Sequence, residues 1–214
     1  MKKVNNNVKM DLGLFGSTWD EVLKDPQTNT GKTEFTKLTN GVTELRFLDG
    51  EPFVRWAHWI AQAKRNVSCL GAECPICEAV KSAKQAGIKP QYSSNRKFAM
   101  HVLNLSTGNV EILEQGKTFF TQLHALHEEI GDIRGYNIKV KTQNAGSTDV
   151  TYTLLPCAPT ELSDEQKELC KELKPFDEIF KKPTREQVLG LMSGKSPEEV
   201  FSNKSSEEDE EVGL

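Results

Sequence analysis

Three cysteines lie within nine residues of this 214-residue chain, at Cys69, Cys74 and Cys77, and the only others are Cys157 and Cys170. Two residues separate Cys74 from Cys77, a spacing that lets both thiolates approach one ion while backbone amides face the sulfurs. Cys69 is close enough in the chain to join them. The cluster therefore predicts a tetrahedral zinc site that needs a fourth ligand.

The fourth ligand is expected to be a histidine. His58 is the best candidate, because it lies eleven residues before Cys69 and near the end of an aromatic, strand-like segment. His101, on the next predicted buried strand, is the second candidate. His124 and His127 are three residues apart on a predicted helix, where such histidines more often flank a buried stripe and face water.

Two other interpretations of the cysteines remain open. Cys74 and Cys77 match the spacing of a redox pair, although no thioredoxin-like βαβ pattern surrounds them. The cluster could also consist of buried cysteines without a ligand. A cytosolic protein is expected, since no apolar run approaches the length of a membrane helix and the first residues do not resemble a secretory signal. Reducing conditions disfavour disulfides there, so Cys157 and Cys170, which lack partner spacing, are predicted to be structural.

No catalytic constellation is evident in the sequence. The triplet Gly-Lys-Thr occurs at 31–33 and at 116–118, like the end of a phosphate-binding loop. Such a loop needs a further glycine five positions before the Gly-Lys pair, and Pro26 and Glu111 occupy those positions. The sequence therefore predicts a protein that is not an enzyme.

Cations and aromatic residues alternate along the β-like segments. Cations that follow phosphates and rings that accept bases of any identity are typical of proteins that bind single strands. The alternative is that the rings fill the core while the cations are solvated, and the alternation does not decide which face is wet. The candidate DNA contacts are Arg46, Arg55, Trp56, Trp59, Lys64, Arg65, Tyr92, Arg96, Lys97, Phe98, Lys117, Tyr136, Lys139, Lys141 and Tyr152.

Charge is distributed unevenly, although the net formal charge is only −4. Residues 161–214 contain fifteen acids and eight bases, a net charge of −7. The remaining nineteen bases and sixteen acids give residues 1–160 a net charge of +3. A mildly basic body therefore precedes an acidic end, a pattern that permits nucleic-acid binding despite the overall negative charge.

Four regions are predicted: a basic N-terminal arm and lead-in segment at 1–32, a core at 33–160 with the zinc loop at 58–77, a helical segment at 161–195, and a disordered acidic tail at 196–214. The fold is expected to be mainly β with helices (α+β), with five to seven short strands, which favours a small closed or partly open barrel. Apolar periodicity and turn residues predict strands at 34–38, 42–48, 53–60, 98–105, 110–113, 136–141 and 150–155, and helices at 75–86, 118–130, 161–174 and 184–191.

The combination of basic arm, small β domain with a zinc loop, and acidic tail resembles the zinc-containing single-stranded DNA-binding proteins of tailed bacteriophages. The likeness covers most of the chain and rests on "FTKLTNGVTELRFLDGEPFVRWAHWI", "VSCLGAECPIC", "KFAMHVLN", "EILEQGKTFFTQL" and "GYNIKVKT…TYTLLP". That group's pattern of one histidine followed by three cysteines falls on His58, Cys69, Cys74 and Cys77.

The resemblance implies an OB-type five-stranded barrel with an inserted zinc loop and one structural Zn²⁺. It also implies a non-catalytic protein that coats single-stranded DNA in phage replication, recombination and repair, in the cytoplasm of the infected bacterial host. The acidic tail would recruit replication and recombination proteins, and self-association on DNA is an open expectation. The basic excess of the body and of the arm is smaller than the group leads us to expect. An RNA-binding regulator and a zinc-ribbon adaptor between proteins remain alternative functions.

Overall fold

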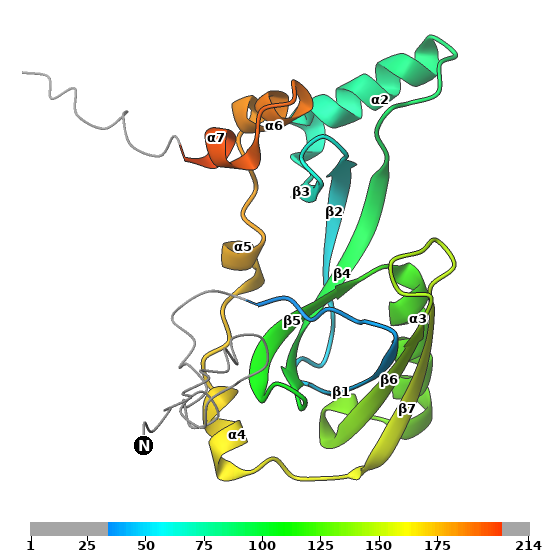
Figure 1. Cartoon of the computed structure of the whole chain (residues 1–214), viewed down its shortest axis with the longest axis vertical. Helices are drawn as coiled ribbons and strands as arrows, with labels where there is room; N and C mark the ends of the chain where they lie inside the picture. Colours follow the sequence, from blue (N-terminus) through cyan, green and yellow to red (C-terminus); the bar gives the residue numbers. More distant parts are fainter. Residues whose placement is uncertain (1–33, 203–214) are drawn as a thin grey trace, which may run out of the picture. The chain divides into compact units, whose positions relative to one another are not determined.

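The structure is a computed structural model that describes residues 34–202. The predicted N-terminal arm and residues 203–214 of the predicted acidic tail lie outside the described residues. Within residues 34–202, seven strands form a mostly antiparallel sheet, with helices between and after them (Figure 1). A mixed α+β fold is therefore confirmed.

The strands pair in the order β3-β2-β4-β1-β6-β7, and β5 pairs with β4 beside this path. β4 is long enough to pair with β2 through its first half and with β1 and β5 through its second. The strands are β1 (Gly41–Phe47), β2 (Phe53–Ile60), β3 (Arg65–Ser68), β4 (Ser94–Asn104), β5 (Asn109–Gln115), β6 (Tyr136–Gln143) and β7 (Thr151–Pro159).

The predicted five-stranded OB-type barrel is not confirmed. The sheet has seven strands and is not closed, since β3 and β7 stand at its two ends. β1 pairs with β4 over only three residues, whereas β2 pairs with β4 over six and continues into a hairpin with β3. The β2–β4 pair thus leads out of the β1–β6–β7 region toward the cysteine loop (Figure 1).

The larger hydrophobic core lies between the sheet and helix α3 (Lys117–Ile130). Phe119, Leu123 and Leu126 of this helix are buried at the predicted spacing, and Ile130 packs partly buried beside them. On β6 the predicted alternation also holds, with Ile138, Val140 and Thr142 buried between exposed lysines. These periodicities confirm the helix predicted at 118–130 and the strand predicted at 136–141, and the structure pairs β6 with β7.

A second hydrophobic core joins the cysteine loop to the C-terminal helices. Ile60 and Val67 come from the β2–β3 hairpin and Ile76 from α2 (Pro75–Gln85), while α6 (Arg185–Met192) and α7 (Pro197–Phe201) supply the other side. α2 begins with Pro75 at its first turn and ends before Gly87, whose φ of +70° lies in the left-handed region that favours glycine. The predicted start of this helix is confirmed, and it ends at Gln85, one residue before the predicted end.

The C-terminal segment forms four short helices. Two of them, α6 and α7, belong to the second core, and the other two are α4 (Asp164–Leu169) and α5 (Phe176–Ile179). α4, α6 and α7 each begin with a capping box, in which a Ser or Thr and a residue three positions later satisfy each other's backbone N–H groups. α7 lies within the segment predicted to be disordered, and its Val200 is buried in the second core. That prediction is therefore wrong for residues 197–201.

No helix among residues 34–202 is both long enough and apolar enough to cross a membrane.

Candidate metal centre and nucleic-acid surface

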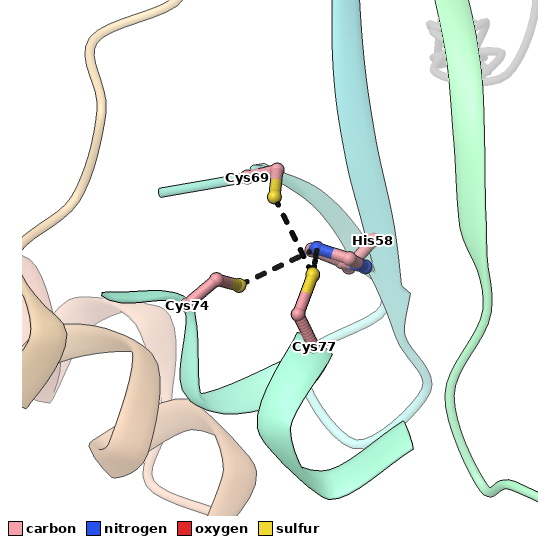
Figure 2. A group of neighbouring side chains, drawn as sticks. All are labelled: His58, Cys69, Cys74 and Cys77. Atoms are coloured by element: carbon pink, nitrogen blue, oxygen red, sulfur yellow. Dashed lines mark hydrogen bonds between the residues drawn. The ribbon is translucent and has the colours of Figure 1, made fainter. Parts of the chain in front are cut away.

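His58, Cys69, Cys74 and Cys77 converge on one point, and their ligand atoms all lie within 4.8 Å of one another (Figure 2). The Sγ atoms of Cys69 and Cys77 are 3.6 Å apart. The Nε2 atom of His58 is 3.4 Å from the Cys74 Sγ and 3.5 Å from the Cys77 Sγ. All three cysteines are free thiols. The four side chains are therefore close enough to hold a metal ion.

Local backbone geometry brings the four ligands together. β2 carries His58, and the β2–β3 hairpin returns the chain so that the Cys69 N–H donates to the Trp56 carbonyl at 2.9 Å. Gly71, with φ at +77°, then turns the chain, and its N–H lies 3.4 Å from the Cys69 Sγ. Cys74 caps α2 and Cys77 lies in its first turn, so one helix start presents both sulfurs.

The donor set matches zinc in both chemistry and size. Three cysteines and one histidine are a common set for structural zinc, and metal–sulfur bonds of about 2.3 Å at tetrahedral angles separate two sulfurs by about 3.8 Å. The observed sulfur separation of 3.6 Å is close to that value. Four protein ligands would leave no open position, which is typical of a structural rather than a catalytic zinc site.

The second ring nitrogen of His58 has a partner of its own. Its Nδ1 lies 3.1 Å from the Ser93 carbonyl oxygen, at a position where N–H donation to this acceptor is favoured. A proton held on Nδ1 leaves the Nε2 lone pair free to coordinate a metal ion between the sulfurs. His58 is fully buried. Ser93 was not predicted as a contributor, and no sequence pattern marks a backbone carbonyl that orients a ligand.

The sulfurs differ in how easily they ionise. Burial disfavours the Cys74 thiolate, but backbone hydrogen bonds at Cys77 and neighbouring residues outweigh it, so the pKa of Cys74 lies below its ordinary value. Burial and the adjacent sulfurs of Cys69 and Cys74 raise the pKa of Cys77 to about 12. A divalent cation would offset this repulsion, because it stabilises every coordinated thiolate.

The other histidines lie away from this cluster. The Nδ1 atom of His101 lies 3.0 Å from a carboxylate oxygen of Asp49, and its Nε2 atom lies 2.9 Å from the Lys174 carbonyl oxygen. His124 and His127 are exposed on α3. Within residues 34–202, the His58 cluster is the only group of three or more metal-ligating side chains that lie close enough together to hold a metal ion.

The predicted DNA contacts divide by exposure. Arg55, Tyr92, Lys97, Phe98, Tyr136 and Tyr152 are half-buried, and Tyr92 packs against the second core, whereas Phe98, Tyr136 and Tyr152 pack against the larger one. Burial raises the pKa of the Tyr152 hydroxyl, which donates to the Gln115 side chain. The exposed contacts are Trp56, Trp59, Lys64, Arg65, Arg96, Lys117, Lys139 and Lys141.

Arg46 is buried, with only 3% of its surface exposed. Its Nε donates to Asn137, and its two terminal nitrogens donate to the carbonyl oxygens of Arg134 and Thr160. Each guanidinium nitrogen is therefore committed to holding β1 against the chain near β6 and after β7. The prediction that Arg46 contacts DNA is wrong for this structure, because a phosphate could not reach it.

Four predicted residues gather on one face of the β2–β4 pair and along α3. Trp56 is opposite Arg96 in the register of the two strands, and the Arg96 guanidinium lies 5.9 Å from the Trp56 ring centroid and 5.4 Å from that of Phe98. Arg96, Phe98 and Lys117 line a groove of ≈ 620 Å³ between the strands and α3. We call this groove, together with Trp56 at its β2 margin, the tryptophan groove.

Other predicted contacts lie elsewhere. Lys139 and Lys141 are exposed on β6, which pairs with β1 and β7 rather than with β2 or β4. Arg65 begins β3, where its guanidinium lies 4.8 Å from the Phe201 ring centroid. The structure therefore brings together only part of the predicted set.

The sequence matches no protein-family model, no curated protein and no solved structure. The class that the fold and the site define is an α+β protein with a mostly antiparallel sheet and a candidate metal centre of one histidine and three cysteines.

Proposed function

We propose that the protein is a non-catalytic, sequence-tolerant single-stranded DNA-binding protein with one structural zinc ion. The observation that carries the proposal is Trp56, which is 54% exposed and has the guanidinium of Arg96 beside its ring. A large aromatic side chain costs free energy when it is exposed to water, and a stacked base would cover it. Stacking of this kind contributes about 1–3 kcal/mol per base.

The tryptophan groove offers the two kinds of contact that a single strand needs. Val54 and Phe98 are paired opposite each other on its floor and supply apolar surface, while Arg96 and Lys117 supply positive charge. Glu51 and Glu128 also line the groove and offset part of that charge. We therefore expect moderate affinity with a clear salt dependence.

The metal centre supports this surface through β2. His58 is two residues from Trp56 on the same strand, and the Cys69 N–H bonds to the Trp56 carbonyl. A zinc ion bound by His58 and Cys69 would hold both segments and fix the strand that presents Trp56. The role proposed for zinc is thus structural: the ion would position Trp56 and would not itself contact DNA.

The biological role rests on the resemblance to the zinc-containing single-stranded DNA-binding proteins of tailed bacteriophages. The protein would coat single strands during phage DNA replication, recombination and repair in the host cytoplasm, and its acidic tail would recruit partner proteins. β1 and β4–β7 around α3 would be the counterpart of that group's OB-type core. This correspondence is supported by the larger hydrophobic core, to which all of these elements contribute.

Binding of equal-length single-stranded DNA, duplex DNA and single-stranded RNA, followed by fluorescence anisotropy at several salt concentrations, tests the proposal. Single-stranded DNA should bind most tightly, and log affinity should fall with log salt by roughly 0.7 per phosphate neutralised. Tighter binding of RNA would favour the RNA-binding regulator, and no binding of any nucleic acid would favour the zinc-ribbon adaptor.

Two variants make the test specific to the groove. Trp56→Ala should weaken single-strand binding by about 1–3 kcal/mol, because a stacking partner is lost. Arg96→Ala should weaken it and reduce the salt slope. Lys167→Ala is the matched control, since this exposed lysine lies on α4 and pairs with Asp164. Equal affinity of all three variants and the wild type would contradict the proposed location of the site.

A further inference from the structure

The segment that follows α5 crosses the face of β2 opposite to the one that carries Trp56. The Phe180 ring is parallel to that of Phe53, with centroids 5.9 Å apart and an interplanar angle of 1°. The Arg55 guanidinium lies over the Phe180 ring, 4.3 Å from its centroid. Two lysines, Lys181 and Lys182, follow directly and are exposed. The Phe180 ring is thereby packed against β2, and two exposed lysines follow it in the chain.

Two hollows flank Phe180. One of ≈ 380 Å³ is lined by Phe53, Trp56 and Lys182, among others. The other, of ≈ 520 Å³, is lined by Lys181 and Arg65, among others. Arg55, Ser68 and Phe180 line both hollows. Each hollow therefore combines aromatic surface with at least one exposed cation.

Arg55 forms the floor that the two hollows share. Its side chain is only 10% exposed, and its terminal nitrogens donate to Ser68 and Glu114. The buried Nε atom has no hydrogen-bond partner. An unpaired buried donor of this kind is costly, and the guanidinium places a positive charge at the base of both hollows.

The smaller hollow adjoins the tryptophan groove. Val54 lines both of them, and Trp56 lines the smaller hollow beside it. The smaller hollow then meets the larger one at Phe180. Neighbouring depressions therefore share lining residues, in a series that runs from α3 across β2 to the start of β3.

Charge favours a polyanion along this extension. Among residues 34–202, the smaller hollow is lined by the cations Arg55 and Lys182 and by no carboxylate. The larger one is lined by three cations, and of its two acids Glu114 is already paired with Arg55. The extension is therefore less opposed by carboxylates than the tryptophan groove, where Glu51 and Glu128 face the ligand.

We infer that a single strand bound in the tryptophan groove continues over Trp56 into these two hollows, and that Phe180, Lys181, Lys182 and Arg65 are part of the binding site. This inference rests on the proposed function and extends its site to the C-terminal segment. Bases would enter beside the Phe180 ring, and the lysines would contact phosphates. None of residues 180–182 was predicted, although the run Phe-Lys-Lys has the same mixture of ring and cation as the predicted contacts.

The test is the double variant Lys181→Ala/Lys182→Ala, titrated with a fluorescent oligo-dT at several salt concentrations. Both lysines are exposed, so the fold and the zinc content should not change. The salt slope should fall by about 1.4 if two phosphate contacts are lost, and affinity at low salt should fall with it. Lys181→Arg/Lys182→Arg should keep the wild-type slope.

Lys167→Ala/Lys171→Ala is the matched control, because it removes the same charge from exposed positions of the same C-terminal region. A wild-type slope in the Lys181/Lys182 double alanine variant, with wild-type DNA binding intact, would overturn the inference and leave the proposed function standing. An equal loss in the control variant would also overturn it, since bulk charge would then be the cause. Failure of the wild type to bind oligo-dT would overturn both.

Discussion

Removal of the metal should unfold one of the two hydrophobic cores and leave the other intact. The simplest perturbation is Cys74→Ser, which replaces a buried ligand at the start of α2. Loss of a thiolate leaves three of the four ligands and should abolish tight zinc binding. Chelation of the wild-type protein should have the same effect without a substitution.

The magnitude follows from the size of the second core. Burial of one aliphatic side chain contributes about 1.5–3 kcal/mol, so six of them contribute on the order of 10 kcal/mol. Structural zinc supplies about 10–16 kcal/mol in zinc-finger peptides at pH 7. Loss of the ion therefore removes as much free energy as the whole apolar packing of this core provides. Its six buried aliphatic residues are Ile60, Val67, Ile76, Val188, Leu191 and Val200.

Hydrogen exchange measured by mass spectrometry can locate the effect. Amides of residues 58–92 and 184–201 should lose protection in Cys74→Ser or after chelation, because these segments share the second core. Amides of residues 98–143 should remain protected, because the larger core uses none of the metal ligands. Cys170→Ser is the control, since this half-buried thiol lies outside the cluster.

Two results would refute this reasoning. Unchanged protection of both cores after complete zinc loss would mean that the metal is not needed for packing. Loss of protection throughout residues 34–202 would mean that the two cores unfold as one unit. Restoration of protection by added zinc in the chelated wild type, but not in Cys74→Ser, completes the expected pattern.

Three further outcomes are expected. Burial disfavours the His101 imidazolium, but the hydrogen bonds to Asp49 and to the Lys174 carbonyl raise the pKa of His101 above its ordinary value. The contribution of the protonated ring to stability should therefore be complete below about pH 6.5 and lost as pH rises through the raised pKa. Denaturant titrations between about pH 6 and pH 9 should show this loss in the wild type but not in Asp49→Asn. Phe119→Ala should lower the free energy of unfolding by about 3–5 kcal/mol with zinc content unchanged, as urea denaturation and metal analysis would show. Thr184→Ala should cost about 1 kcal/mol through its capping box, and faster amide exchange in α6 would report it.

The sequence predicts those parts of the fold that depend on local pattern. The spacing of Cys74 and Cys77, the apolar stripe of α3 and the alternation on β6 all concern residues close in the chain. The choice between His58 and His101 was also correct as far as proximity goes, because only His58 lies beside the three sulfurs. The supporting reason, a position near the end of an aromatic, strand-like segment, matches β2, which ends at Ile60.

The features that the sequence did not predict depend on contacts between distant residues. Closure of the sheet depends on pairing between its end strands, which no local pattern encodes. β3 is four residues long and follows Lys64, whose φ of +46° is unusual for a residue other than glycine. Arg46 occupies an alternating position on β1 that suggests exposure, but residues 134–137 and 160 cover it. α7 had a usable signal, a Ser196–Glu199 capping box before an apolar pair, but the surrounding acidic composition outweighed it.

The way the second core is assembled has a consequence for folding during synthesis. The four metal ligands leave the ribosome early, yet the helices that complete their core are made much later. The ion pair between Arg185 and Glu78, which joins α6 to α2, spans 107 residues of chain. A nascent chain can thus present a metal site before its apolar cover exists. Zinc that binds at this stage would have to hold the β2–β3–α2 segment alone, so metal supply during translation should affect the yield of folded protein more than metal supply afterwards.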